Sequence, residues 1–219
     1  MSKTLLTVDV IYAVIALIMT VIGIYKHFMK KSPLFVRMVV CVVGCRFFDG
    51  TLEVLLVRGG IDVDLFTISG LVQVAQFLFL ICASIGALDS LCDDGSKTFR
   101  KYRVISTVIP AMVFIGMIII LGMLHFPKGE MIMRLMGAAF ALFAMYFHIK
   151  HLIIPDVEGG IVRSIRLYNV IGIINCLAFL VCYTAHTNSI PWIVARVVYI
   201  LVTITILPAL MYGVKKWTE

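Results

Sequence analysis

The chain has 219 residues, of which 62% are hydrophobic and only 14% are charged, whereas an average soluble domain has about 45–50% apolar and about 25% charged residues. Its mean hydropathy is +1.07, and apolar runs longer than about 18 residues, the length of a membrane span, recur along the sequence. This composition excludes a soluble enzyme, a disordered chain and a disulfide scaffold, and it predicts an all-helical, polytopic membrane protein.

Stretches of about 20 residues, bounded by charged residues, glycine or proline, predict a bundle of seven transmembrane helices. In chain order the predicted spans are 4–25, 34–57, 65–88, 102–124, 130–152, 161–186 and 190–214. The spans leave only about eight residues for each connection, so we expect a single transmembrane domain over 1–219 and no soluble domain. The first span is too long for a signal peptide, and we expect it to remain in the mature protein.

Most Lys and Arg residues lie at one end of the predicted spans. Those at this end are Lys26, Lys30, Lys31, Arg37, Lys97, Arg100, Lys101, Arg103, Lys150, Arg163, Arg166, Lys215 and Lys216. Those at the opposite end are Lys3, Arg58 and Lys128. Because positively charged loops stay in the cytoplasm, we expect an outside N-terminus and a cytoplasmic C-terminus in a multi-pass protein of the cell membrane. The net charge of +7 then reflects topology and a lipid bilayer partner, and no nucleic acid is needed to explain it.

Polar and small residues recur at helical spacing in six of the seven spans. Such stripes mark helix faces that point into a membrane bundle. The candidate ligand-binding residues on these faces are Asp9, Arg46, Asp49, Glu53, Gln73, Gln76, Arg134, Asn175, Arg196 and Tyr199. The fourth span, from Val104 to Leu124, carries no charge and no amide. We therefore expect it at the edge of the bundle, against lipid.

The second span carries the most informative stripe, with Arg46, Asp49, Gly50 and Glu53 on one helical face. Each charge near the bilayer centre opposes insertion by about 2.5–3.5 kcal/mol, so each needs a partner. We expect Arg46 and Asp49 to pair within the helix, and Glu53 to find a partner on another span. By depth, an outer layer should contain Asp9, Glu53, Arg134 and Arg196, with the remaining charges of the second span nearer the midplane.

The six charges within the spans, three acidic and three basic, have two interpretations. They can form a self-neutralising network that only specifies helix packing. Alternatively, they line a water-accessible cavity, open to the outside, that binds a polar or charged small solute or relays protons. The number of charges favours the second interpretation, because Ser, Thr or Asn would specify packing at a lower insertion cost.

The cysteines and histidines suggest no established chemistry. Of the six cysteines, only Cys92 lies near a loop, so we expect no disulfide. A cytoplasmic zinc site is an alternative, and its ligands would come from His27, His148, His151, Asp89, Cys92 and Asp94. No metalloprotease motif accompanies these residues, and we expect no catalytic residue, no metal and no cofactor. The seventh span has no lysine that would attach retinal, which excludes a light-absorbing microbial rhodopsin.

The ends of the first and fifth spans are weakly alike. At the end of the first span, Tyr25 is followed by Lys-His, and Pro33 lies eight residues after Tyr25. At the end of the fifth span, Phe147 is followed by His, and Pro155 lies eight residues after Phe147. With an edge-like fourth span, this similarity suggests two three-helix units joined by a linker helix, a 3+1+3 arrangement. In length, orientation and layout the chain resembles the SWEET and PQ-loop sugar or amino-acid carriers. It has no Pro-Gln dipeptide, and no proline in the first, second or sixth span, so the resemblance covers topology alone.

Three functions are compatible with these features. The leading hypothesis is a small transporter or permease, because the spans leave no room for an output domain. The second is a sensory or receptor module, in which a bound ligand shifts a two-state bundle that signals to a cytoplasmic protein partner. The third is an intramembrane metal-dependent hydrolase built on the cytoplasmic His and Asp residues. We therefore expect an integral membrane protein that binds a small polar solute and is not an enzyme.

Overall fold

The computed structural model describes residues 3–29, 32–59, 65–93, 95–124, 128–155, 161–185 and 189–218, which form an all-helical bundle. Its long helices are α1 (Lys3–Gly23), α2 (Leu34–Gly59), α3 (Leu65–Ala83), α5 (Arg100–Met123), α6 (Lys128–Ile153), α7 (Arg166–Thr184) and α8 (Ile190–Thr218). A short helix, α4 (Asp89–Cys92), and a 3₁₀ turn (Lys97–Phe99) connect α3 to α5. Two π-helical turns, Ile24–Phe28 and Ser84–Leu88, extend α1 and α3.

Six of these seven helices are long and apolar enough to cross a membrane. The exception, α2, is equally long but carries Arg46, Asp49 and Glu53 in its interior. The prediction of an all-helical membrane protein is thus confirmed. The helix bounds lie within a few residues of the predicted spans, except that α7 begins at Arg166 because residues 161–165 form turns instead.

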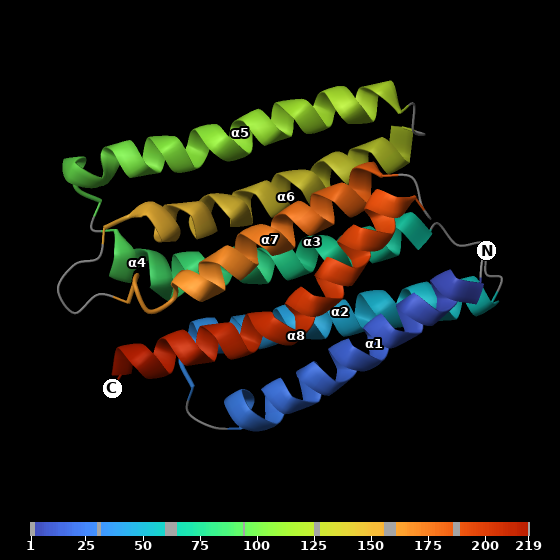
Figure 1. Cartoon of the computed structure of the whole chain (residues 1–219), viewed down its shortest axis with the longest axis horizontal. Coiled ribbons are helices and arrows are strands. Elements are labelled where there is room, and N and C mark those ends of the chain that lie inside the picture. Colours follow the sequence, from blue (N-terminus) through green and yellow to red (C-terminus); the bar gives the residue numbers. More distant parts are fainter. Residues whose placement is uncertain are drawn as a thin grey trace.

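The helices pack in two consecutive sets of three (Figure 1). In the first set α1 packs on α2 and α2 on α3, and in the second α6 packs on α7 and α7 on α8. Contacts of α3 with α6, and of α8 with α1 and α2, join the two sets. The remaining long helix, α5, packs mainly on α6, and its outer side chains, such as Met112, Ile115 and Ile119, are exposed. The predicted fourth span therefore lies at the edge of the bundle, as expected.

The two termini lie at opposite ends of the bundle (Figure 1). The end at which α1 begins is called the N-terminal end below, and the end at which α8 finishes is called the C-terminal end. On α2, which runs back toward the N-terminal end, Glu53 lies nearest that end and Arg46 farthest from it. Three apolar grooves of about 460, 450 and 390 Å³ lie on the outer surface of the bundle, where lipid chains would contact them.

Two glycines allow bulky side chains to enter the helix interfaces. A Cβ on Gly50 would lie 2.8 Å from Tyr12 Cδ1, so α1 and α2 approach closely there. A Cβ on Gly172 would lie 2.4 Å from the imidazole of His148, between α6 and α7. Small residues serve this purpose in membrane bundles, where close approach of helices replaces the hydrophobic driving force. Both Tyr12 and His148 are consequently buried.

Candidate functional site

Arg196 on α8 joins carboxylates from α1 and α2. Its Nη2 donates a hydrogen bond to Asp9 Oδ1 at 3.0 Å and another to Glu53 Oε2. The guanidinium also lies over the ring of Tyr12, 4.6 Å from its centroid. The Glu53 side chain stays 27% exposed, while those of Asp9 and Arg196 are buried. We call Asp9, Glu53 and Arg196 the outer triad, and it contains one more acid than base.

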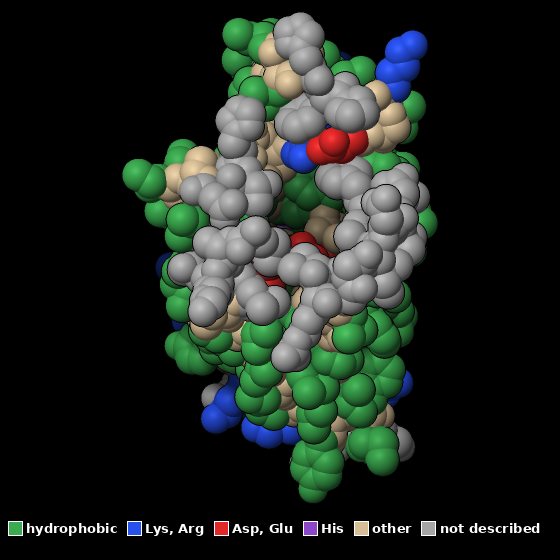
Figure 2. Space-filling model, turned by 90° about the vertical axis from the view of Figure 1, so that its right-hand side faces the viewer, with side chains coloured by type: hydrophobic (Ala, Val, Ile, Leu, Met, Phe, Trp, Pro, Cys, Tyr) green, Lys and Arg blue, Asp and Glu red, His purple; other side chains and the backbone are tan. Residues whose placement is uncertain are grey.

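The surface at the N-terminal end is hollowed. Figure 2 looks onto this end and shows a hollow between the helix ends, with acidic side-chain atoms visible inside it. The described acidic residues near this end are Asp9, Asp49, Glu53 and Glu130. These acidic residues therefore lie beneath a hollow at the N-terminal end of the bundle.

Asp49 lies one helical turn deeper than Glu53 on α2. It is 2% exposed, and its Oδ1 accepts hydrogen bonds from Ser69 Oγ at 2.6 Å and Gln73 Nε2 at 3.0 Å, both from α3. Its second oxygen, Oδ2, has no partner in the described part of the chain. Asp49 is thus a buried carboxylate that is bonded only to neutral groups.

Arg46 is the deepest charge on α2 and is fully buried. Its Nε donates to Gln76 Oε1 at 3.2 Å, its Nη1 donates to Thr203 Oγ1 at 2.7 Å, and its Nη2 donates to Asn175 Oδ1. Its guanidinium carbon lies 4.4 Å from the ring centroid of Tyr199. Neutral groups from three other helices, α3, α7 and α8, therefore hold this guanidinium.

The predicted pairing of Arg46 with Asp49 is wrong. Among the described residues, no carboxylate forms an ion pair with Arg46. The reason is that α3 places amide and hydroxyl groups against both side chains, while α7 and α8 surround the guanidinium further. Two opposite charges one helical turn apart are consequently both solvated by neutral dipoles instead of by each other.

Arg134 does not join the outer triad, so the predicted outer layer is divided. Its Nε and Nη2 donate to Glu130 Oε1 at 2.9 and 2.6 Å on the same helix, and its Nη1 donates to the backbone carbonyl of Tyr183. The Tyr183 hydroxyl in turn donates to Gln73 Oε1. Arg134 thus connects to the Asp49 group through Tyr183 and Gln73.

Glu130 and Tyr183 were missed as site residues, although the sequence contains a signal for each. Glu130 lies four residues before Arg134, a spacing that brings helical side chains together. Tyr183 lies on the same face of α7 as Asn169, Gly172, Cys176 and Phe179, at successive steps of three or four residues. Following this face to the end of the helix identifies Tyr183.

Tyr12 and Tyr199 lie between Arg196 on α8 and Arg46 on α2. The rings of Tyr12 and Tyr199 are 5.9 Å apart, with Arg196 over the first and Arg46 over the second. The network contains four buried atoms without a partner in the described part of the chain: Tyr12 OH, Asp49 Oδ2, Asn175 Nδ2 and Arg196 Nε. Buried polar atoms are nearly always paired in native proteins, so each of these atoms requires a partner that the described residues do not supply.

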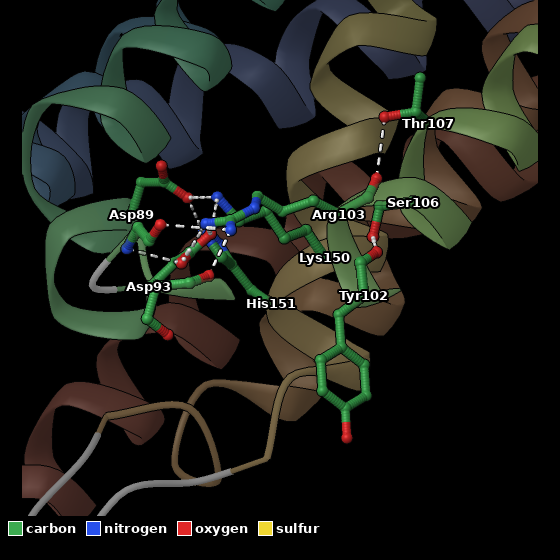
Figure 3. Close-up of polar contacts among 10 residues, drawn as sticks. Asp89, Asp93, Tyr102, Arg103, Ser106, Thr107, Lys150 and His151 are labelled. Carbon is green, nitrogen blue, oxygen red and sulfur yellow. Dashed lines mark hydrogen bonds and ion pairs between the residues drawn. The ribbon is translucent and has the colours of Figure 1, made fainter. Parts of the chain in front are cut away.

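A second charged cluster lies near the C-terminal end of the bundle, where α4 and the residues after it meet α5 and α6 (Figure 3). Lys150 Nζ on α6 lies 2.6 Å from Asp89 Oδ1 and 2.8 Å from Asp93 Oδ2. Arg103 on α5 pairs with Asp93 at 2.9 Å, and His151 Nε2 lies 3.1 Å from Asp89 Oδ1. Lys150 was predicted to lie among the basic residues at one end of the spans, and its side chain, only 4% exposed, attaches the α3–α5 connection to α6.

Both carboxylates of this cluster are ionised at neutral pH. Burial raises the pKa of Asp89, but hydrogen bonds from His151 and Lys150 outweigh this effect, so the pKa lies below its ordinary value. Burial also raises the pKa of Asp93, and hydrogen bonds from Lys150 and the Gly95 backbone outweigh it, so this pKa is lowered too. The cluster is therefore a set of closed ion pairs.

The zinc alternative gains no support from this cluster. The described residues contain no group of three or more His, Cys, Asp or Glu placed to hold a metal. His148 Nδ1 instead bonds to Asn169 Oδ1 at 3.1 Å, and His27 Nδ1 to Ser32 Oγ at 3.3 Å. Asp94, another predicted ligand, lies outside the described residues.

All ten predicted site residues are nonetheless within or next to one network. Asp9, Glu53 and Arg196 form the outer triad, and Gln73 bonds to Asp49. Gln76, Asn175 and Tyr199 surround Arg46, and Arg134 pairs with Glu130. No protein-family model, no curated protein and no solved structure matches this chain. The chemistry of the network is consequently the basis for assigning a function.

Proposed function

We propose that this protein is a transporter of a small polar or charged solute. In this proposal the chain spans the cell membrane seven times, with α2 as the central charged span, the N-terminus outside and the C-terminus in the cytoplasm. The two three-helix sets are the moving units of a 3+1+3 arrangement, and α5 links them at the edge. The distribution of Lys and Arg supports the orientation, and the packing of the helices supports the division into units.

One observation carries the proposal: Arg46 and Asp49 are buried one turn apart without pairing with each other. A network that only specified packing would gain most from pairing opposite charges directly, because a buried ion is costly unless it is paired and fully hydrogen-bonded. Here neutral amides and hydroxyls hold both charges, and Asp49 Oδ2 has no partner in the part of the chain that the structure describes. Such groups exchange readily with the polar groups of a solute. Intramembrane charges with this character mark solute pathways in membrane proteins.

The outer triad controls access to these two charges. It lies closer to the hollow at the N-terminal end (Figure 2) than Asp49 and Arg46 do, and its Glu53 is partly exposed. Along α2 a solute meets Glu53, then Asp49 about 6 Å deeper, and then Arg46 about 4.5 Å deeper still, at about 1.5 Å per residue. Entry therefore requires the contacts between Arg196 and the two triad carboxylates to rearrange.

Uptake by sealed proteoliposomes tests this proposal. The probes are a panel of labelled small solutes: neutral sugars, carboxylates, amines and zwitterionic amino acids. The wild type should take up at least one of them, and Glu53→Gln should reduce that uptake at least tenfold without loss of folded protein. Thr205→Val is the matched control, because Thr205 is exposed on α8 and bonds only to carbonyls of its own helix. Uptake that Glu53→Gln leaves unchanged would refute the proposal.

A receptor predicts a different result in the same experiment. A solute would then bind and stabilise the protein without crossing the bilayer, and a cytoplasmic protein partner would respond to it. If solutes of the panel bind to the protein but none of them crosses the bilayer, the result favours a receptor over a transporter.

A further inference from the structure

We infer that the site at Arg46 and Asp49 binds a small zwitterion, a molecule that carries both a carboxylate and an ammonium group. This inference rests on the proposed function, since it names the class of solute that the same site accepts. It follows from the chemistry of two buried charges of opposite sign that neutral groups hold apart.

The carboxylate of the solute belongs at Arg46. A guanidinium presents five N–H donors in a planar fork that matches a carboxylate. In the described part of the chain the three donor nitrogens of Arg46 contact only an amide oxygen of Gln76, a hydroxyl of Thr203 and an amide oxygen of Asn175. Asn175 Nδ2 is buried beside them without a partner among the described residues, and it supplies a further donor for a carboxylate oxygen. Three of the five N–H donors of Arg46 are thus bonded to neutral groups, and no described carboxylate supplies a counter-charge.

The ammonium group belongs at Asp49. Its Oδ1 is occupied by Ser69 and Gln73, whereas its Oδ2 has no partner among the described residues. The hydroxyl of Tyr12 is likewise buried without a described partner, and its ring packs against Gly50, the next residue of α2. An ammonium group needs acceptors for three N–H bonds, and it finds a charged oxygen and a hydroxyl oxygen in this region.

The order of charges along the path sets the direction of the solute. Glu53 and Asp49 lie nearer the hollow, Arg46 lies deeper, and the outer triad contains one more acid than base. The carboxylate of the solute therefore points inward toward Arg46 and its ammonium group points outward. A neutral solute would leave both buried charges uncompensated, and a simple anion or cation would compensate only one.

The spacing limits the size of the solute. The backbone positions of Arg46 and Asp49 are three residues apart on α2, a rise of about 4.5 Å. Because both side chains start from one turn of the same helix, we expect short chains, from an α-amino acid to a γ-amino acid, to fit better than molecules whose charges lie far apart.

Thermal unfolding of the purified protein in detergent tests this inference. The zwitterionic probes are glycine, β-alanine and 4-aminobutyrate, and acetate and methylammonium carry only one of the two charges. At a hundred times its Kd, a bound zwitterion should raise the Tm by about 5 °C or more, and the single-charge probes at the same concentration should not.

Two variants locate the binding site. Asp49→Asn keeps the shape and the Oδ1 hydrogen bonds but removes the charge, so it should weaken binding of the zwitterion at least tenfold. Arg46→Lys keeps the charge but loses the planar fork, and it should weaken binding similarly. We choose it instead of Arg46→Gln, because glutamine would leave a buried cavity without a charge. Thr205→Val should bind as the wild type does.

The outcomes separate this inference from the proposed function. The inference is overturned if acetate or methylammonium stabilises the protein as much as the zwitterions do. It is also overturned if none of the probes stabilises the protein. If a neutral or singly charged solute is transported in a Glu53-dependent manner, the inference fails and the transport proposal stands. If a zwitterion stabilises the wild type in an Asp49-dependent manner but is not taken up, the inference stands and transport fails.

Discussion

Thr203 and Thr205 show how the position of one residue decides whether it belongs to the network. Both lie on α8 and both donate a hydrogen bond to the carbonyl four residues earlier, at 2.9 and 2.8 Å. Thr203 is fully buried and also accepts the 2.7 Å hydrogen bond from Arg46. Thr205 is exposed where lipid would lie. We therefore expect the hydroxyl to contribute to stability at Thr203 and not at Thr205.

Replacing each threonine with valine tests this difference. Thr203→Val should lower the free energy of unfolding by about 1–2 kcal/mol, because it leaves an N–H of a buried charge without its acceptor. Thr205→Val should change it by no more than about 0.5 kcal/mol, as surface changes do. Reversible unfolding in mixed detergent micelles measures both. Equal effects of the two substitutions would show that Arg46 does not depend on the Thr203 hydroxyl.

Residue-level reasoning from the sequence found the buried charges and placed Asp9, Glu53 and Arg196 in one layer, but it did not find the partners of Arg46 and Asp49. Helical spacing decides which face of α2 carries Arg46, Asp49 and Glu53, and this does not depend on the other helices. Partner choice does depend on them, since a long guanidinium reaches whichever acceptor the neighbouring helices bring near. The predicted i, i+3 pairing of Arg46 with Asp49 therefore failed. Gln76, Asn175 and Thr203 accept the hydrogen bonds of Arg46 instead.

At the scale of elements, the α6–α7 interface depends on one glycine. The His148 imidazole lies where a Cβ of residue 172 would be, at 2.4 Å. Gly172→Ala should therefore destabilise the protein by about 1–3 kcal/mol, the usual cost of overpacking. The loss should be smaller in a His148→Ala background, because the clash is then absent.

Gly116→Ala is the matched control for this interface. No atom of the described residues lies within 4 Å of a Cβ at Gly116, on the peripheral helix α5. The substitution should leave stability unchanged or raise it by about 0.5–1 kcal/mol, as expected for removing a helical glycine. Thermal unfolding of the single and double variants checks the coupling. An equal loss from Gly172→Ala with and without His148 would contradict the proposed clash.

The cluster at the C-terminal end should make the attachment of the α3–α5 connection depend on pH. The pKa of Asp93 is below its ordinary value of 3.8, so its contribution to stability is fully present above that pH and is lost as the pH falls through the lowered value. Asp93→Asn should therefore lower the Tm at pH 7, and the difference from the wild type should shrink at pH 3. A difference of the same size at both pH values would mean that the ion pairs of Asp93 do not stabilise the fold.

The bounds of the elements were largely predictable, because an apolar stretch of about 20 residues is the strongest signal in a membrane protein. The start of α7 was not, since Ile161, Val162 and Ile165 are apolar yet buried in turns against the bundle. Hydropathy measures burial in any apolar environment and does not distinguish a helix from a packed turn. The ion pair between Lys150 and Asp89 of α4 was not predictable either, because a charge near the end of a span usually marks a loop.

At the scale of the whole molecule, Arg46 connects the two three-helix sets. It lies on α2 and binds Gln76 of α3 in its own set, and Asn175 of α7 and Thr203 of α8 in the other set. The outer triad likewise joins α1 and α2 to α8. A movement of one set against the other therefore changes the contacts of both groups together. This coupling is what a carrier needs to open its site to one side of the membrane at a time.

Counterflow across a sealed bilayer tests this account most directly, because it requires the site to face both sides in turn. Proteoliposomes loaded with an unlabelled solute that stabilises the protein are diluted into the same labelled solute. The account predicts a transient accumulation of label that Glu53→Gln abolishes and Thr205→Val preserves. A solute that stabilises the protein but gives no accumulation in the wild type would contradict it.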